Sequence, residues 1–221
     1  MKTITIPKSF GYPTVDIVIN NVKHTLLSGV EISVEDYIAE VIENAIALAP
    51  KIGRNKSKLV QRAEGSITEL TANDLEGIEK IAYYAFYSCG SLTKVEIPNS
   101  VASIGEGAFY NCKLLESVEI PDGVRSIGTN AFTACKVLKS VKFGKDSRLE
   151  SIGVNAFEWC DKLTSIYLPE TPPTLTNVSA FANINKACIF YCKTQESLNA
   201  YKAATNWSTL TGTYTFKVES K

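Results

Sequence analysis

Apolar positions recur at a fixed interval along most of the chain, with the same residue type at each step. Four cysteines follow Ala-Phe pairs by the same offset and are 23, 23 and 25 residues apart: Cys89, Cys112, Cys135 and Cys160. Downstream of each cysteine runs an alternating segment of the form Leu-x-x-Val-x-Ile-Pro, first at residues 92–98. A fifth, degenerate copy keeps Ala180-Phe181 but has Asn183-Ile184 at the cysteine position. Because one such unit cannot bury its apolar positions alone, the period predicts a solenoid whose stacked units share one core.

Each unit contains three local patterns. Val95-Glu96-Ile97 alternates like a half-buried strand, so the equivalent strands of successive units are expected to pair in a parallel sheet. Ile-Gly pairs at residues 104–105, 127–128 and 152–153 are expected to turn the chain. The Ala-Phe-x-x-Cys stretch predicts about one helical turn that points Phe and Cys inward. In the third copy Gly144 replaces the proline and residues 145–148 are added, so a bulge or bend is expected there.

Residues 1–50 lack this period and predict a small α+β element. Segments 3–6 and 15–19 alternate as short strands, and Asn20-Asn21 is expected to turn the chain toward a third strand at 22–26. Ser33 precedes an acidic first turn and apolar positions at helical spacing up to Pro50, which predicts a helix with Ser33 as its N-cap. About 50 residues bury little core, so we interpret them as an attachment element that contacts a particle or further copies of the chain.

Residues 51–65 are rich in cations and have little periodicity. Their composition is typical of a solvated linker, and the alternative interpretation is a patch for phosphate or an anionic surface. The cations are Lys51, Arg54, Lys56, Lys58 and Arg62. The expected organisation is therefore an attachment element at 1–50, a basic linker at 51–65, repeats at 66–175, and a degenerate last repeat with a C-terminal cap at 176–221.

The period, the Leu-x-x-Val-x-Ile-Pro strand and the Ile-Gly-x-x-Ala-Phe-x-x-Cys segment resemble the BspA-like class of leucine-rich repeat over roughly residues 66–210. Residues 167–173, 180–181 and 200–207 resemble the way such arrays close. The resemblance implies an α/β repeat solenoid, a leucine-rich-repeat-like stack of short parallel strands and short helical turns. It also implies a non-enzymatic recognition surface, often on the exterior of a cell or particle. More loosely, the predicted helix, the basic linker and residues 67–72 resemble bacteriophage or prophage tail modules.

Charge and hydropathy exclude several classes of partner. The 23 Lys and Arg residues balance 23 Asp and Glu residues in 221, so the broad basic footprint of a nucleic-acid-binding protein is missing. Uninterrupted apolar stretches such as residues 45–49 are far too short to cross a bilayer. Pro7, Lys8, Pro13 and Asp16 interrupt any apolar region of a secretory signal. We therefore expect cytoplasmic synthesis followed by virion assembly, or a cell-surface position if a leader has been removed.

The residues that carry most enzyme chemistry are scarce, and we expect no enzyme, cofactor or metal. His24, the single histidine, is interpreted as a surface or strand residue, and the repeated cysteines as small buried apolar side chains. Cys188 and Cys192 are likewise assigned to the core, ahead of a metal or disulfide role. Sequons at Asn177 and Asn206 are attributed to chance. The enzyme alternative is a glycan hydrolase using Glu96 and Glu119, but one strand spacing is closer than glycosidase carboxylates require.

The outward strand positions remain as a candidate binding surface. They are expected to stack into two columns across the sheet: Lys94, Ser117, Ser140, Ser165, and Glu96, Glu119, Lys142, Tyr167. Mixed charge, small hydroxyls and one aromatic ring suit contact with a protein or a cell-surface glycan, although any solvated sheet face has a similar composition. The leading hypothesis is a non-catalytic binding or structural module associated with a phage tail. The alternative is a bacterial cell-surface adhesin of the BspA-like type.

Overall fold

The computed structural model describes residues 68–75 and 77–220 with their side chains, and the backbone of four short strands before them. Strand β1 (Lys2–Thr5) pairs antiparallel with β4 (Glu31–Val34), and β2 (Thr14–Ile19) pairs antiparallel with β3 (Val22–Leu27). Ile19 lies opposite Val22, and His24 lies opposite Ile17. The predicted pairing of these two segments is therefore confirmed, while Asn20-Asn21 itself falls outside the described residues.

The predicted helix start at Ser33 is wrong. Ser33 lies inside β4, opposite Thr3, and the strand continues to Val34. An N-cap residue and a strand residue share an extended backbone, so the local sequence fits both, and only the pairing with a distant segment decides between them. The rest of the predicted helix and the basic linker at 51–65 lie outside the described residues.

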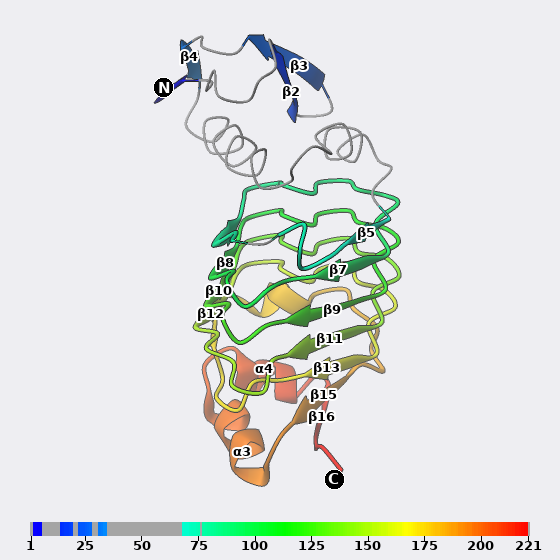
Figure 1. The fold of residues 1–221 in the computed structure, drawn as a ribbon. Coiled ribbons are helices and arrows are strands. Elements are labelled where there is room, and N and C mark those ends of the chain that lie inside the picture. Colours follow the sequence, from blue (N-terminus) through cyan, green and yellow to red (C-terminus); the bar gives the residue numbers. More distant parts are fainter. Residues whose placement is uncertain are drawn as a thin grey trace.

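One side of the solenoid is a seven-stranded parallel sheet, as predicted (Figure 1). Each repeat contributes one strand, and Val95, Val118, Val141 and Ile166 lie opposite one another in register. These side chains point into the core, and the residues on either side of them point outward. The strands, in spatial order, are β5 (Glu69–Leu70), β7 (Lys94–Glu96), β9 (Ser117–Ile120), β11 (Ser140–Phe143), β13 (Ser165–Tyr167), β15 (Ile189–Cys192) and β16 (Thr215–Val218).

A second parallel sheet covers another side of the coil and was not predicted. Its five two-residue strands place a buried Ile or Leu beside an outer polar residue, and the glycine of each Ile-Gly pair follows its strand. The isoleucine is therefore part of a sheet, and the turn begins only after it. These strands are β6 (Lys80–Ile81), β8 (Ser103–Ile104), β10 (Ser126–Ile127), β12 (Ser151–Ile152) and β14 (Thr174–Leu175).

The Ala-Phe-x-x-Cys stretch is not the predicted helical turn. In the second copy the N–H groups of Gly107, Phe109 and Asn111 donate to carbonyls of the next coil, at 2.7–2.9 Å. The N–H groups between them bond three residues back within the coil. This alternation needs a left-handed backbone at two positions per copy, and Gly107 and Asn111 have φ angles of 58° and 61°. The Ala-Phe-x-x-Cys stretches of successive copies form one side of the solenoid, the turn side. Its main chain bonds to the next coil, whereas the main chain of an α-helix bonds within the helix.

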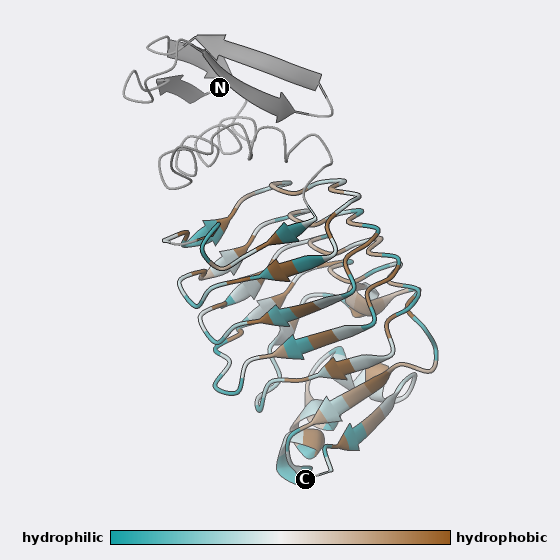
Figure 2. Cartoon of the chain, turned by 45° about the vertical axis from the view of Figure 1, so that its right-hand side comes forward, coloured by the Kyte–Doolittle hydropathy of each residue, from teal (hydrophilic) through white to brown (hydrophobic). Residues whose placement is uncertain are grey.

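The core is a set of ladders of identical side chains. In Figure 2 the hydrophobic positions recur in the strands of successive coils. Five phenylalanine rings stack along the solenoid axis with centroids 5.1–5.4 Å apart: Phe86, Phe109, Phe132, Phe157 and Phe181. The cysteines form a parallel ladder, in which the thiols of Cys112, Cys135 and Cys160 donate to the phenylalanine carbonyls of the preceding coil, at 3.2–3.3 Å. The inward placement of Phe and Cys was predicted and is confirmed.

The longer third copy leaves the sheet regular. β11 keeps its register with β9 through Phe143, so the expected bulge or bend does not occur in the strand. The added residues form a turn in which the Asp122 carboxylate accepts a hydrogen bond from the Asp146 N–H at 2.9 Å. Leu149 fills the core beside them. The insertion is accommodated in the connection between the two sheets.

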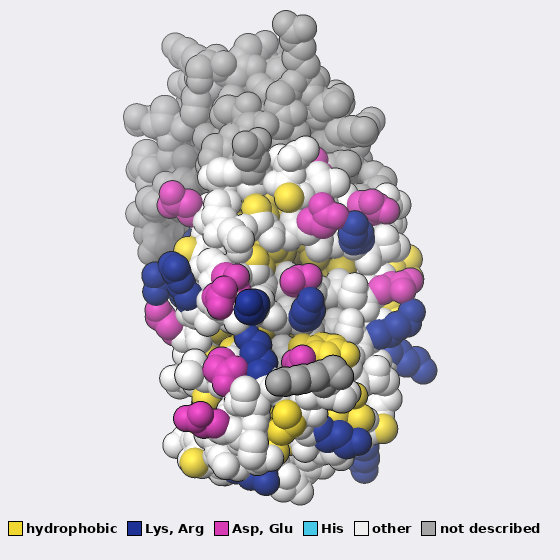
Figure 3. Space-filling model, turned by 60° about the horizontal axis from the view of Figure 1, so that its bottom comes forward, with side chains coloured by type: hydrophobic (Ala, Val, Ile, Leu, Met, Phe, Trp, Pro, Cys, Tyr) yellow, Lys and Arg dark blue, Asp and Glu magenta, His cyan; other side chains and the backbone are white. Residues whose placement is uncertain are grey.

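The last coil is closed by a short 3-10 turn, η3 (Val178–Phe181), and two helices, α3 (Gln195–Ala203) and α4 (Trp207–Thr211). Trp207 is fully buried, and its indole N–H donates to the Pro173 carbonyl at 2.7 Å. Tyr201 packs edge-on against it and donates to the Pro169 carbonyl. On the face turned toward this end, charged side chains of both signs lie among small hydrophobic patches (Figure 3). Within the described ranges, no helix is both long and apolar enough to span a membrane.

The glycines after the second sheet offer a test of this close stacking. A Cβ added at Gly128 would lie 2.6 Å from the Glu106 backbone nitrogen, whereas a Cβ at Gly90 would meet only a carbonyl at 3.8 Å. Because backbone atoms of the adjacent coil cannot move aside, Gly128→Ala is expected to lower the free energy of unfolding by about 1–3 kcal/mol. Gly90→Ala is the matched control and is expected to change it by less than about 0.5 kcal/mol. Urea unfolding of both variants measures this, and equal losses would contradict the close approach.

Candidate functional site

All eight predicted site residues lie on the outward face of the seven-stranded sheet. The pairing places Lys94, Ser117, Ser140 and Ser165 in one column. Glu96, Glu119, Lys142 and Tyr167 form the second column, two residues further along each strand. The seven strands hold both columns in place because the residue between them, such as Val118 or Val141, is locked into the core.

The columns are longer than predicted. Glu69 lies opposite Lys94 at one end. At the other end Ile189 and Thr215 continue the first column, and Tyr191 and Lys217 continue the second. The sequence signal for these additions is the alternation of residues 188–192 and 214–218, which lie outside the recognisable Leu-x-x-Val-x-Ile-Pro motif.

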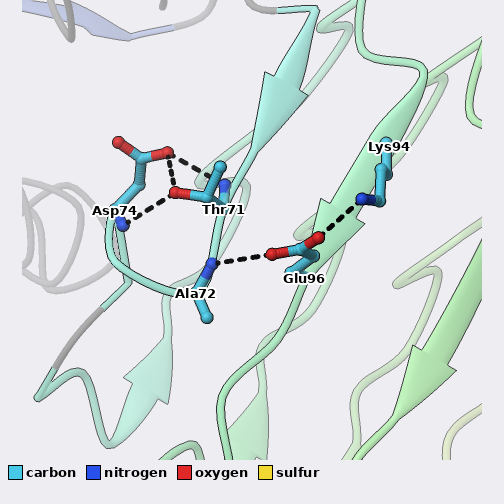
Figure 4. A network of polar contacts seen from close by, with 5 residues as sticks. All are labelled: Thr71, Ala72, Asp74, Lys94 and Glu96. Atoms are coloured by element: carbon cyan, nitrogen blue, oxygen red, sulfur yellow. Dashed lines mark hydrogen bonds and ion pairs between the residues drawn. The ribbon is translucent and has the colours of Figure 1, made fainter.

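Charges on the first strands of the face are paired with each other (Figure 4). The Lys94 ammonium lies 2.6 Å from the Glu96 carboxylate, whose other oxygen accepts from the Ala72 N–H at 3.4 Å. The Lys94 hydrogen bond is the main reason that the pKa of Glu96 is lowered, and Glu96 raises the pKa of Lys94 in turn. Next to them, the Asp74 carboxylate accepts from the hydroxyl and the N–H of Thr71 and caps the turn. A carboxylate that is held ionised in this way is a poor general acid, which weighs against the hydrolase alternative.

Two further ion pairs cross from coil to coil. Glu116 and Lys139 lie 2.9 Å apart, and Glu119 and Lys142 lie 4.0 Å apart. All four side chains are more than half exposed, so each pair contributes at most about 1 kcal/mol to stability. These charges are therefore available for a partner without a large cost to the fold.

The later strands of the face carry aromatic rings. Tyr167 and Tyr191 stack with their centroids 4.9 Å apart and their planes 13° from parallel. They lie side by side on β13 and β15, between Lys142 on β11 and Lys217 on β16. Both rings are partly buried by their neighbours but remain accessible.

The six cysteines are free, buried and part of the core, as predicted. Burial raises the pKa of Cys89 and of Cys192 to about 11, and it raises the pKa values of the four other thiols as well. Thiolates are the form that binds metal or reacts, so these residues are poorly suited to either role. In the part of the chain with described side chains, no group of three or more potential metal ligands is present.

A second accessible set of large side chains lies on the turn side and was missed by the sequence analysis. Tyr87 and Tyr110 stack with centroids 5.3 Å apart. Trp159, 47% exposed, lies two coils further along, with the Lys136 ammonium 5.1 Å from its ring centroid. These residues occupy variable positions around the Phe and Cys ladder, so the repeat pattern gave no reason to group them.

Several known proteins are similar to parts of the chain. A leucine-rich repeat protein from Bacteroides ovatus is 40% identical over 51% of this chain, with a TM-score of 0.45. A leucine-rich repeat protein from T. pallidum is 30% identical over 57% of this chain, also with a TM-score of 0.45. The pneumococcal vaccine antigen PcpA is 18% identical over 70% of it, with a TM-score of 0.44. The matches span 28%, 52% and 42% of those chains, about half of their length or less. No curated protein matches significantly.

The family assignment follows from a match that covers more than half of the sequence. The family model of the BspA type leucine rich repeat region matches residues 79–207 in six copies. These residues include the Phe and Cys ladders and most strands of both parallel sheets. The resemblance to phage tail modules has no counterpart among the matches described here. The chain belongs to the BspA-type leucine-rich repeat family.

Proposed function

We propose that this protein is a non-catalytic binding module that recognises its partner with the outward face of the seven-stranded sheet. The observation that carries the proposal is the register of the sheet, which gathers exposed side chains from seven separate segments into two straight columns. The rigid core fixes their spacing, so a partner meets a preformed surface and little conformational entropy is lost on binding.

The chemistry of this face supports binding more than catalysis. Glu96 is held as a carboxylate by Lys94, and the Lys142 ammonium lies 4.0 Å from the Glu119 carboxylate. Neither glutamate lies in the apolar surroundings that make a carboxyl group a proton donor at neutral pH. Exposed pairs of this kind instead contribute to the rate and specificity of association with a charged partner.

Reversal of the charges on the face tests the proposal. A variant with Glu96→Lys, Glu119→Lys and Lys142→Glu is expected to lose capture of its partner from host extract in a cross-linking pull-down, because each surface charge then repels its counterpart. Glu150→Lys is the matched control, since it adds the same net charge near the second sheet. Thermal unfolding of both proteins establishes that the fold is retained. Capture at the wild-type level by the triple variant would remove this face from consideration.

We make two further proposals for the biological setting of the module. The leading one is a bacteriophage or prophage tail, with residues 1–50 as the attachment element, and the other is a bacterial surface adhesin. Fractionation of a tagged protein in its native host after prophage induction separates them. Co-purification with particles supports the tail setting. A position in the envelope without particles supports the adhesin.

A further inference from the structure

The outward face of the seven-stranded sheet is divided by charge. On the first three strands, β5, β7 and β9, the outward positions of the two columns hold three acids, one lysine and one serine: Glu69, Lys94, Glu96, Ser117 and Glu119. On the last four strands, β11, β13, β15 and β16, the same two columns hold no acid. Their residues are Ser140, Lys142, Ser165, Tyr167, Ile189, Tyr191, Thr215 and Lys217.

The tyrosine pair lies at the centre of the later half. Strand side chains stand roughly perpendicular to the sheet, so the phenol groups of Tyr167 and Tyr191 point outward. Because the rings stack nearly parallel at 4.9 Å, their two hydroxyl groups are similarly spaced. Within residues 68–75 and 77–220 neither hydroxyl has a hydrogen-bond partner, so both can donate. One carboxylate can accept from both, with O–H···O distances of about 2.7 Å. The positive ring edges also favour an anion there.

Two lysines flank this pair along the same column. Lys217 on β16 lies opposite Tyr191 and has no ion pair with a described residue. Lys142 on β11 lies opposite Tyr167, and its contact with Glu119, at 4.0 Å, is the longest ion pair among the described residues. The acids that follow these strands, Glu170 and Glu219, lie outside the two columns, and the Glu170 carboxylate accepts from the Thr194 hydroxyl. The half-face therefore presents hydroxyl donors between two cations.

We propose that strands β11, β13, β15 and β16 form a binding site for an acidic polysaccharide, with a uronic acid carboxylate seated on the Tyr167–Tyr191 pair. This inference rests on the proposed function and specifies the chemical class of the ligand that the face binds. Lys142 and Lys217 bind the carboxylates of the neighbouring sugar units. Ser140, Ser165 and Thr215 bind sugar hydroxyls along the first column.

The hydroxyl content of the site favours a glycan over an acidic peptide. Five of its eight outward positions carry a hydroxyl group, and Ile189 is the single aliphatic side chain. Tyrosine occurs at protein interfaces as well, but the small hydroxyl residues of the first column, Ser140, Ser165 and Thr215, do not supply the further large anchors on which such interfaces depend. A polyhydroxylated chain that also carries carboxylates matches the donors, the cations and the extended shape of the columns.

Calorimetry with the full chain and a short oligogalacturonate tests the site. The fully methyl-esterified oligomer, which keeps the hydroxyls and loses the charge, is expected to bind at least about tenfold more weakly. The double variant Tyr167→Phe, Tyr191→Phe keeps the stacked rings and removes both donors, and it is expected to lose about tenfold in affinity, as is Lys217→Ala. Lys113→Ala, at an exposed lysine outside the strands of this sheet, is the matched control and is expected to bind as the wild type.

The assignment would be overturned by no binding of oligogalacturonate, by equal binding of its methyl ester, or by full affinity in the Phe double variant. Equal or tighter binding of poly-glutamate would also overturn it and assign the site to an acidic peptide. The pull-down with the charge-reversed face decides the proposed function separately. If the wild-type protein captures a partner and the charge-reversed variant does not, while oligogalacturonate does not bind, the ligand class is wrong and the recognition face stands. If charge reversal leaves capture unchanged and oligogalacturonate does not bind, both the proposed function and the ligand assignment fail.

Discussion

A Phe132→Ala protein is expected to lose about 3–5 kcal/mol of its free energy of unfolding. Phe132 is fully buried and stacks between Phe109 and Phe157, with ring centroids 5.1 Å and 5.2 Å away. Its removal leaves a cavity bounded on both sides by rings that cannot collapse, because the coils that carry them are joined by main-chain hydrogen bonds. The loss therefore combines the transfer free energy of the ring with the cost of the void.

Chemical denaturation followed by circular dichroism measures this effect. Phe86→Ala is the matched control within the same ladder, because Phe86 has one stacked phenylalanine neighbour and is slightly exposed. Its loss is expected to be smaller, since the end of the ladder can relax around the gap. A loss at Phe132 below about 1 kcal/mol, or equal losses at both positions, would show that the stacked rings do not carry the core as described.

A Trp207→Ala protein is also expected to lose about 3–5 kcal/mol, but mainly from the C-terminal coils. Trp207 packs on Phe181 and Tyr201, and its indole N–H satisfies the buried Pro173 carbonyl. Without the indole the last coil exposes its apolar end and leaves that carbonyl unpaired. In a solenoid each coil contacts only its neighbours, so the loss of the cap is felt first at the nearest strands.

Hydrogen exchange resolves this local effect. Protection is expected to fall in β15 and β16 before it falls in β9, and the overall unfolding midpoint is expected to drop. Trp207→Phe keeps most of the apolar volume and removes only the donor, so about 1–3 kcal/mol is expected for the unpaired carbonyl alone. Trp159→Ala is the exposed control and is expected to change stability little. Uniform loss of protection along the whole array would contradict the capping role.

The features that depend on repetition were predictable from the sequence. A buried residue such as Phe132 or Cys135 recurs in every copy with the same neighbours, so its inward position and the parallel pairing of its strand follow from the period alone. The second sheet was missed because a two-residue strand such as Ser126–Ile127 is too short to show alternation. Its signal was the serine before each isoleucine, which recurs in three copies.

The wrong predictions concern backbone conformation and distant pairing. Asn130 and Asn155 take the left-handed conformation, which their residue type allows, and they would have argued against a helical turn. Tyr84 and Trp159 adopt it as well, although bulky residues rarely do. The residue types at these positions therefore did not indicate a left-handed backbone in every copy. For the site, all eight predicted residues are gathered on one face, whereas Tyr191 and Lys217 were missed because their strands lie beyond the last regular motif.

The hydrogen bonds between coils on the turn side are formed by the main chain and do not depend on which side chain stands at the variable positions. The two faces through which an internal coil contacts the coils before and after it are therefore alike from one coil to the next. Duplication of residues 113–135 would insert one further coil without creating a new kind of interface. Each insertion would add a strand with the outward residues of β9, so it would lengthen the acidic half of the sheet face by one strand spacing, about 4.8 Å. The length of the acidic half can thus change in fixed steps during evolution, while the four strands of the later half keep their chemistry.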